Sequence, residues 1–207
     1  MNPTMPIPIN KRKQTLASKI KRVRAIQWAL RPEILCSENI PKPLHGVAPR
    51  VVLGDKWWNQ TRKAAYASTA YHCVACGDHK SQVKGNRKHL EGHELYDIDY
   101  PKGLMVYIET VPLCNWCHSY VHDGRLTALM EQGVIPQQKY VAVIQHGDEV
   151  LNRYNMVRPS RKERDEVIAL QLSFGKIAEW SKWRLVVNGK QYKPRYKDLK
   201  SWEKAHS

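Results

Sequence analysis

The sequence is short of acidic residues, of phenylalanine and of long apolar runs. Its 207 residues include 19 Asp and Glu against 34 Lys and Arg, which gives a net charge of +15. No run approaches the roughly 18 consecutive apolar residues of a membrane-spanning helix, so we expect no membrane partner. The N-terminal segment also lacks the apolar region of a secretory signal. These absences predict a cytoplasmic protein.

Apolar residues are nevertheless frequent enough for a folded chain. The single phenylalanine is accompanied by seven tryptophans and ten tyrosines, and hydrophobic residues make up 42% of the sequence. This composition excludes wholesale disorder, and the length suits one or two domains. We expect a basic N-terminal arm with a helix and a proline-bearing linker over 1–54, a compact core over 55–133, and a basic accessory α+β region over 134–207.

The positive charge is concentrated at the two ends of the chain. Residues 1–72 carry 13 basic and 3 acidic side chains, whereas residues 73–125 carry 6 and 7. Basic flanks around a neutral centre indicate a polyanionic partner, and we expect DNA, with RNA not excluded. The alternative is that these side chains only solvate exposed helices. The expected nucleic-acid contacts in the arm are Lys11, Arg12, Lys13, Lys19, Lys21, Arg22 and Arg24.

Local patterns predict several helices. Apolar spacing indicates a helix over 15–31 and a second over 56–69, with Asp55 as its N-cap. A third is expected over 119–132, ending at Gly133. Ser160 and Glu163 form a capping-box pattern before a fourth helix. The apolar stripe of this fourth helix consists of Val167, Leu170, Phe174 and Ile177.

Strands are predicted at three places. The β-prone run over 140–144 is expected to be a strand, and Asn188-Gly189 between two such runs predicts a hairpin with a type I′ turn. Residues 89–100 also read as a strand, with Gly92 and Glu94 facing one way and Glu91 and His93 the other.

Four of the five cysteines form two Cys-x-x-Cys pairs. Cys73 and Cys76 make the first pair, and Cys114 and Cys117 make the second. Two such pairs match the four thiolates of a tetrahedral structural Zn²⁺ site. A disulfide framework is the competing interpretation, but it is more typical of small secreted proteins. The remaining cysteine, Cys36, is expected to be a small buried side chain.

Histidines and carboxylates accompany the cysteine pairs. His118 follows Cys117 directly and His122 comes four residues later, a spacing that brings two imidazoles to one side of a helix. Between the pairs, His93 and Glu94 lie in the predicted strand. Imidazoles, carboxylates and surrounding positive charge are the groups needed for metal-assisted hydrolysis of phosphodiesters.

The order of these motifs resembles the HNH endonucleases over residues 57–126. The pattern consists of Cys-x-x-Cys, then Leu-Glu-Gly-His-Glu, then Leu-Cys-x-x-Cys-His-x-x-x-His. The resemblance implies an α+β protein with a ββα-metal core and zinc-ribbon-like knuckles. It also implies an enzyme that nicks or cleaves DNA and that belongs to a phage-type variant of these endonucleases with a His-Glu signature. For such a phage protein the compartment would be the host-cell cytoplasm, and the partners would include a homodimer or a larger phage assembly.

The resemblance assigns roles residue by residue. His93, His118 and His122 would hold a catalytic Mg²⁺ or another divalent ion such as Mn²⁺ or Ni²⁺, and Glu94 would be the general base. A shift of one residue would make His93 the base instead. Further phosphate contacts are expected at Arg62, Lys63 and Arg125.

Two residues depart from the family's pattern. Glu94 stands where a histidine base is usual, and Glu109 stands where an asparagine is usual. The alternative function is therefore a non-catalytic zinc module that binds nucleic acid through a degenerate HNH site.

Overall fold

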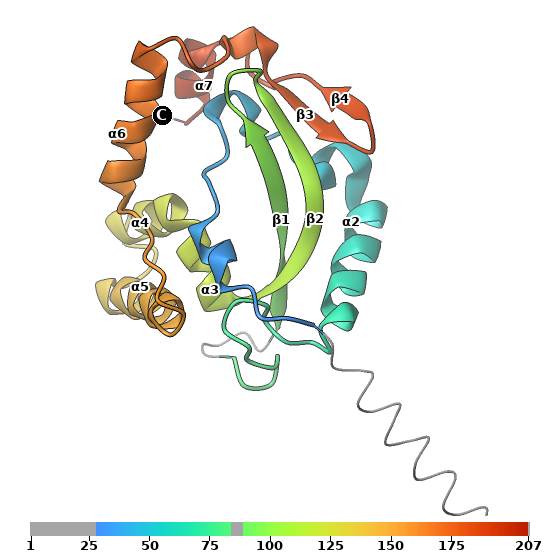
Figure 1. The fold of residues 1–207 in the computed structure, drawn as a ribbon, viewed down its shortest axis with the longest axis vertical. Helices are drawn as coiled ribbons and strands as arrows, with labels where there is room; N and C mark the ends of the chain where they lie inside the picture. The colour runs from blue at the N-terminus through green and yellow to red at the C-terminus, as the bar shows by residue number, and fades with distance from the viewer. Residues whose placement is uncertain (1–27, 84–88, 207) are drawn as a thin grey trace, which may run out of the picture.

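The computed structural model describes residues 28–83 and 89–206, which form a mixed α+β fold around one four-stranded sheet (Figure 1). The predicted α+β class is confirmed. The strands are β1 (Leu90–Asp99), β2 (Leu104–Cys114), β3 (Arg184–Val187) and β4 (Lys190–Tyr192). The α-helices are α2 (Pro49–Ser68), α3 (Asn115–Val121), α4 (Asp123–Glu131), α5 (Gln137–Asn152), α6 (Arg161–Ser173) and α7 (Leu199–His206). Short 3₁₀ helices are η1 (Pro32–Cys36), η2 (Lys42–Leu44) and η3 (Trp180–Lys182).

The sheet has the strand order β1-β2-β3-β4. β1 and β2 form a long antiparallel hairpin in which His93 lies opposite Val111, and the register shifts between Leu95 and Tyr96. β3 pairs with β2 in parallel, and β4 returns antiparallel to β3. β1 is therefore an edge strand, and a cavity lies along it.

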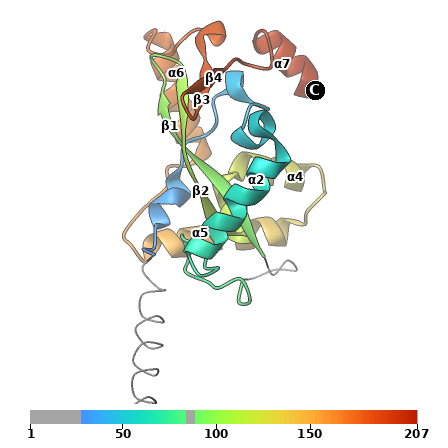
Figure 2. The same ribbon diagram turned by 90° about the vertical axis from the view of Figure 1, so that its right-hand side faces the viewer.

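Helices cover both faces of the β1–β2 hairpin. α2 crosses one face, as Figure 2 shows, whereas α3, α4 and α5 gather on the other side in Figure 1. Gly92 of β1 permits the close approach of α2, because a Cβ atom there would lie 2.9 Å from the Trp58 ring. The alternation predicted for this strand is confirmed, since Gly92 and Glu94 face α2 while Glu91 and His93 face α3.

Two buried clusters form the core. The larger one surrounds the cysteine pairs and joins η1, β2, α3 and α5 through residues such as Leu35, Leu113 and Leu151. The smaller one lies at the other end of the sheet around Trp183, with Met105 and Leu185 against it. The cysteine region is thus packed into the main core and is not an appendage of it.

Several local predictions are confirmed. Asn188 and Gly189 both adopt the left-handed conformation that a type I′ turn requires, with φ of 50° and 74°. Ser160 and Glu163 form the complete capping box at the start of α6. Gly133 also has a left-handed φ of 70° just beyond α4.

The predicted strand over 140–144 is wrong, because these residues lie within α5. Its buried side includes Val143, Gly147, Val150 and Leu151, which recur at helical spacing against the core. Packing of this side against α3 outweighs the β-propensity of the valines, tyrosine and isoleucine.

One predicted helix boundary is wrong and another is nearly right. The helix expected over 56–69 corresponds to the part of α2 that follows the non-helical Gly54, whose φ is 80°, and a short helical segment from Pro49 precedes this break. The single helix expected over 119–132 is divided into α3 and α4 at His122, whose backbone is not helical. The predicted helix over 15–31 lies almost wholly outside the described residues.

Of the apolar stripe predicted for helix α6, only Ile177, which lies beyond the end of α6, packs against a core cluster. Val167, Leu170 and Phe174 are all more than half exposed, and α6 has no buried residue. The helix is instead anchored at its start, where Arg164 contacts Asp123 and the Pro159 carbonyl. Within the described residues, no helix combines the length and the apolar character needed to cross a membrane.

We predict that Gly147→Ala destabilises the protein strongly. The Tyr120 ring packs directly on Gly147, and an added Cβ would lie 2.1 Å from Cδ2 of that ring. The helices α3 and α5 would have to separate, and overpacking of this kind costs about 1–3 kcal/mol or more. The free energy of unfolding from urea denaturation measures the effect. Gly124→Ala in helix α4 is the control, because an added Cβ there would come no closer than 3.9 Å to its nearest neighbour, Arg161. Equal stabilities of the two variants would contradict the prediction.

Candidate metal centres and phosphodiester site

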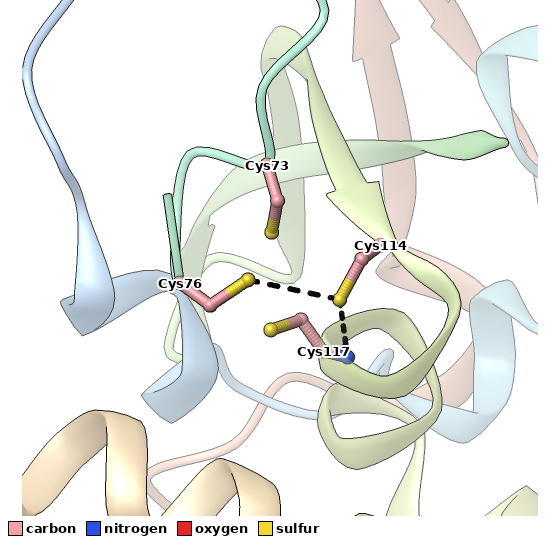
Figure 3. Close-up of side chains that lie close together, drawn as sticks. All are labelled: Cys73, Cys76, Cys114 and Cys117. Atoms are coloured by element: carbon pink, nitrogen blue, oxygen red, sulfur yellow. Dashed lines mark hydrogen bonds between the residues drawn. The ribbon is translucent and has the colours of Figure 1, made fainter. Parts of the chain in front are cut away.

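The four paired cysteines converge on one point, as Figure 3 shows. Their sulfur atoms lie within 4.8 Å of one another, and Cys73, Cys114 and Cys117 are buried. The Cys76 and Cys114 sulfurs are 3.8 Å apart, the spacing of about 3.8 Å that Zn–S bonds of about 2.3 Å give in a tetrahedron. None of the five cysteines forms a disulfide. The predicted cluster is confirmed as a group that could hold a metal ion, and its chemistry is compatible with structural zinc.

Local backbone geometry builds both halves of this cluster. After the first pair, Gly77 turns the chain with a φ of 85°, and its N–H donates to the Cys73 carbonyl. In the second pair, Cys114 ends β2 and caps α3, because its sulfur accepts a hydrogen bond from the Cys117 N–H. These turns aim all four side chains inward.

A histidine from a distant helix completes the surroundings of the sulfurs. His146 of α5 is buried, and its Nε2 lies 3.4 Å from the Cys117 sulfur. An N–H donor at this distance stabilises a thiolate and thereby favours metal binding. His146 was not predicted as a site residue, because it lies 29 residues from Cys117, just beyond a segment predicted to be a strand.

Three histidines form a second cluster beside the first. The candidate ligand atoms of His93, His118 and His122 lie within 4.8 Å of one another. Their ring centroids are 4.7–5.5 Å apart and all three pairs meet edge to face. His93 comes from β1, His118 from α3, and His122 from the break between α3 and α4. The structure therefore brings together all three residues that the sequence predicted as ligands.

Glu91 fixes the orientation of His118. The Nδ1 of His118 donates to the Glu91 carboxylate at 2.5 Å, and Asn115 donates to its other oxygen at 2.8 Å. The hydrogen bond from His118 lowers the pKa of Glu91 to about 2. This bond leaves Nε2 of His118 as the nitrogen available to a metal, which is the usual role of a carboxylate behind a ligating histidine. The sequence placed Glu91 on the His93 side of the strand but did not assign it this function.

The other two histidines are neutral at physiological pH. Burial, with a further contribution from His122, lowers the pKa of His93 to about 2, and burial together with His118 lowers that of His122 to about 3. Among the described residues, the buried Nδ1 of His93 has no hydrogen-bond partner. Neutral imidazole is the form that binds metals, so the donor set and this unpartnered nitrogen fit a divalent ion.

Glu94 lies next to His93 but faces α2. Its side chain is buried, one carboxylate oxygen lacks a hydrogen-bond partner, and Arg50 approaches it at 3.8 Å. Burial raises the pKa of Glu94, although Arg50 opposes the shift. A cavity of about 280 Å³ at the edge of β1 is lined by Glu94, His93 and His122. Glu94 and two residues of the histidine cluster therefore border one cavity. Arg50 was not predicted as a site residue.

The predicted phosphate contacts lie on two different sides of the sheet. Arg125 is exposed on α4 and lines a cavity with His118 and His122. Arg62 and Lys63 lie on α2, on the other side of the sheet, and Arg62 is held by Asn59. The basic residues predicted between Lys11 and Arg24 lie outside the described residues.

Glu109 forms an ion pair with Arg31. Its carboxylate pairs with Arg31 at 2.5 Å, and it lies opposite Leu95 across the hairpin. The residue at the position of the family's asparagine is therefore engaged in an ion pair with the segment before η1.

Comparison with protein-family models, with curated proteins and with solved structures finds no match for this chain. The function must accordingly be argued from the site itself.

Proposed function

We propose that the protein is a metal-dependent endonuclease of the HNH type that hydrolyses DNA phosphodiester bonds. The observation that carries the proposal is the convergence of His93, His118 and His122 within 4.8 Å, with Glu91 orienting His118. A four-cysteine cluster that only stabilises the fold has no need of a second set of three converging imidazoles beside it. Strand β1, helix α3 and the break between α3 and α4 each contribute one of the three histidines.

Each residue of the site has a separate role in the proposed hydrolysis. His93, His118 and His122 would hold the catalytic divalent ion, Mg²⁺, Mn²⁺ or Ni²⁺. When bound, this ion supplies a Lewis acid for the charge that develops on the phosphodiester. Glu94 takes a proton from the attacking water, and its burial makes it a stronger base than a solvated carboxylate. Arg125 neutralises a phosphate at the edge of the cluster.

Nicking of supercoiled plasmid tests the proposal. The purified protein is incubated with Mg²⁺, Mn²⁺ or Ni²⁺, with and without EDTA, beside His93→Ala and His122→Ala. We expect metal-dependent nicking that falls by more than about 100-fold in both variants, because loss of a hydrogen bond to a ligand alone costs 10–100-fold. His206→Ala on the distant helix α7 is the control and should retain nicking.

Binding of DNA without cleavage would contradict the proposed endonuclease. If the wild-type protein binds plasmid in a salt-sensitive manner but nicks it with none of these metals, the endonuclease is excluded. The remaining function would then be that of a non-catalytic zinc-containing module that binds nucleic acid.

A further inference from the structure

A large cavity opens directly beside the histidine cluster. Its volume is about 730 Å³, within the range of about 300–1,000 Å³ typical of ligand pockets. His118 and His122 form one side of it, and the hairpin of α4 and α5 forms the opposite wall. A phosphate at the histidines would therefore lie at the mouth of this cavity.

The lining of the cavity is apolar in its depth and basic at its rim. Leu126 is buried, and Leu129, Ile135 and the Trp116 ring are half-buried around it. Arg125 and Lys139 are exposed at the edge. The only carboxylate among the described lining residues is Glu91, which is engaged by His118 and Asn115. Such a lining suits a ligand with a flat apolar part and an anionic part.

We infer that this cavity receives an unpaired base of the nucleic-acid substrate, whose phosphate lies between Arg125, Lys139 and the histidines. A base within a duplex is stacked on both faces, so it cannot enter a concave pocket unless it leaves the helix. An undistorted duplex would contact only the basic rim and would leave the apolar lining empty. The inference rests on the proposed function and deepens it, because it names single-stranded or locally unpaired DNA as the preferred substrate.

Fluorescence anisotropy with labelled oligodeoxynucleotides tests the inference. A single strand, the matching duplex and a duplex with one bulged nucleotide are compared in buffer without added divalent metal, so that binding is measured without cleavage. We expect the single strand and the bulged duplex to bind at least about tenfold more tightly than the perfect duplex, given the usual contribution of stacking. Equal affinities would overturn the inference.

Variants that fill the cavity provide the second measurement. Leu129→Trp and Ile135→Trp should each weaken single-strand binding about tenfold and leave duplex binding unchanged. Val134→Trp is the control, because Val134 is 63% exposed in the same connection and does not line the cavity. Zinc content and melting temperature verify that each variant is folded. If neither folded variant weakens single-strand binding, the cavity is not the binding site for the base.

The two proposals fail in different ways. Metal-dependent nicking without any preference for unpaired DNA would remove the inference and leave the endonuclease. A preference for unpaired DNA that depends on the cavity, with no cleavage under any metal, would retain the inference as a binding mode and remove the enzyme.

Discussion

Cys114→Ser is expected to abolish zinc binding by the four-cysteine cluster and to unfold the protein at physiological temperature. The Cys114 side chain is 2% exposed and belongs to the main core. It also ends β2 and caps α3, so its loss disturbs the sheet, the helix and the metal cluster together. Structural zinc contributes about 10–16 kcal/mol in small zinc-binding peptides, which exceeds the total stability of many domains. Zinc content by mass spectrometry and thermal unfolding by circular dichroism measure the result.

Cys36→Ser is the matched control for this prediction. Cys36 is half-buried at the margin of the same core and does not belong to the four-cysteine cluster. It should retain one zinc ion per chain and a melting temperature close to that of the wild type. A wild-type protein purified without chelator that contains no zinc, or a Cys114→Ser variant that melts like the wild type, would contradict the assignment of the cluster.

Glu94→Gln is expected to lower the nicking rate by about 10²–10⁴-fold, the usual contribution of a general base. The substitution preserves the size of the side chain but removes its ability to accept a proton. Because Arg50 is half exposed and 3.8 Å away, loss of the ion pair should change the melting temperature little. Initial rates of plasmid nicking at saturating metal measure the effect.

Glu109→Gln distinguishes this catalytic role from a general effect of lost charge. Glu109 pairs with Arg31 and lies outside the histidine cluster, so its variant should nick at nearly the wild-type rate. If Glu94→Gln nicks as fast as the wild type while His93→Ala does not, Glu94 is not the base. Titration of the variant with Mn²⁺ would show whether metal affinity has changed instead.

Features fixed by residues close together in the chain were predicted correctly, whereas features fixed by packing between distant segments were not. The Asn188-Gly189 turn and the capping box at Ser160 depend on residues one to three positions apart, and both were predicted correctly. The strand over 140–144 was predicted wrongly, because its true period appears only when the side of α5 that packs on α3 is known. The apolar stripe of α6 shows the converse, since helical spacing alone does not ensure burial.

The candidate site likewise combines residues that the sequence identified with residues that only the tertiary fold brings together. Spacing identified the four-cysteine cluster and paired His118 with His122, and the resemblance to the HNH endonucleases added His93. The residues that orient or surround them were missed, because Glu91, Arg50 and His146 are joined to their partners only by the tertiary fold.

The sequence by itself determined the ligand types and the uneven charge, and its resemblance to the HNH endonucleases implied the α+β class. The first two follow from residue identity or short spacing, which the chain carries whether or not it is folded. Only the tertiary structure decided that His122 lies at a break between two helices, that Glu91 holds His118, and that a mixed apolar and basic cavity adjoins the histidines. These features depend on strand register and helix packing between residues far apart in the chain, and no local pattern specifies them.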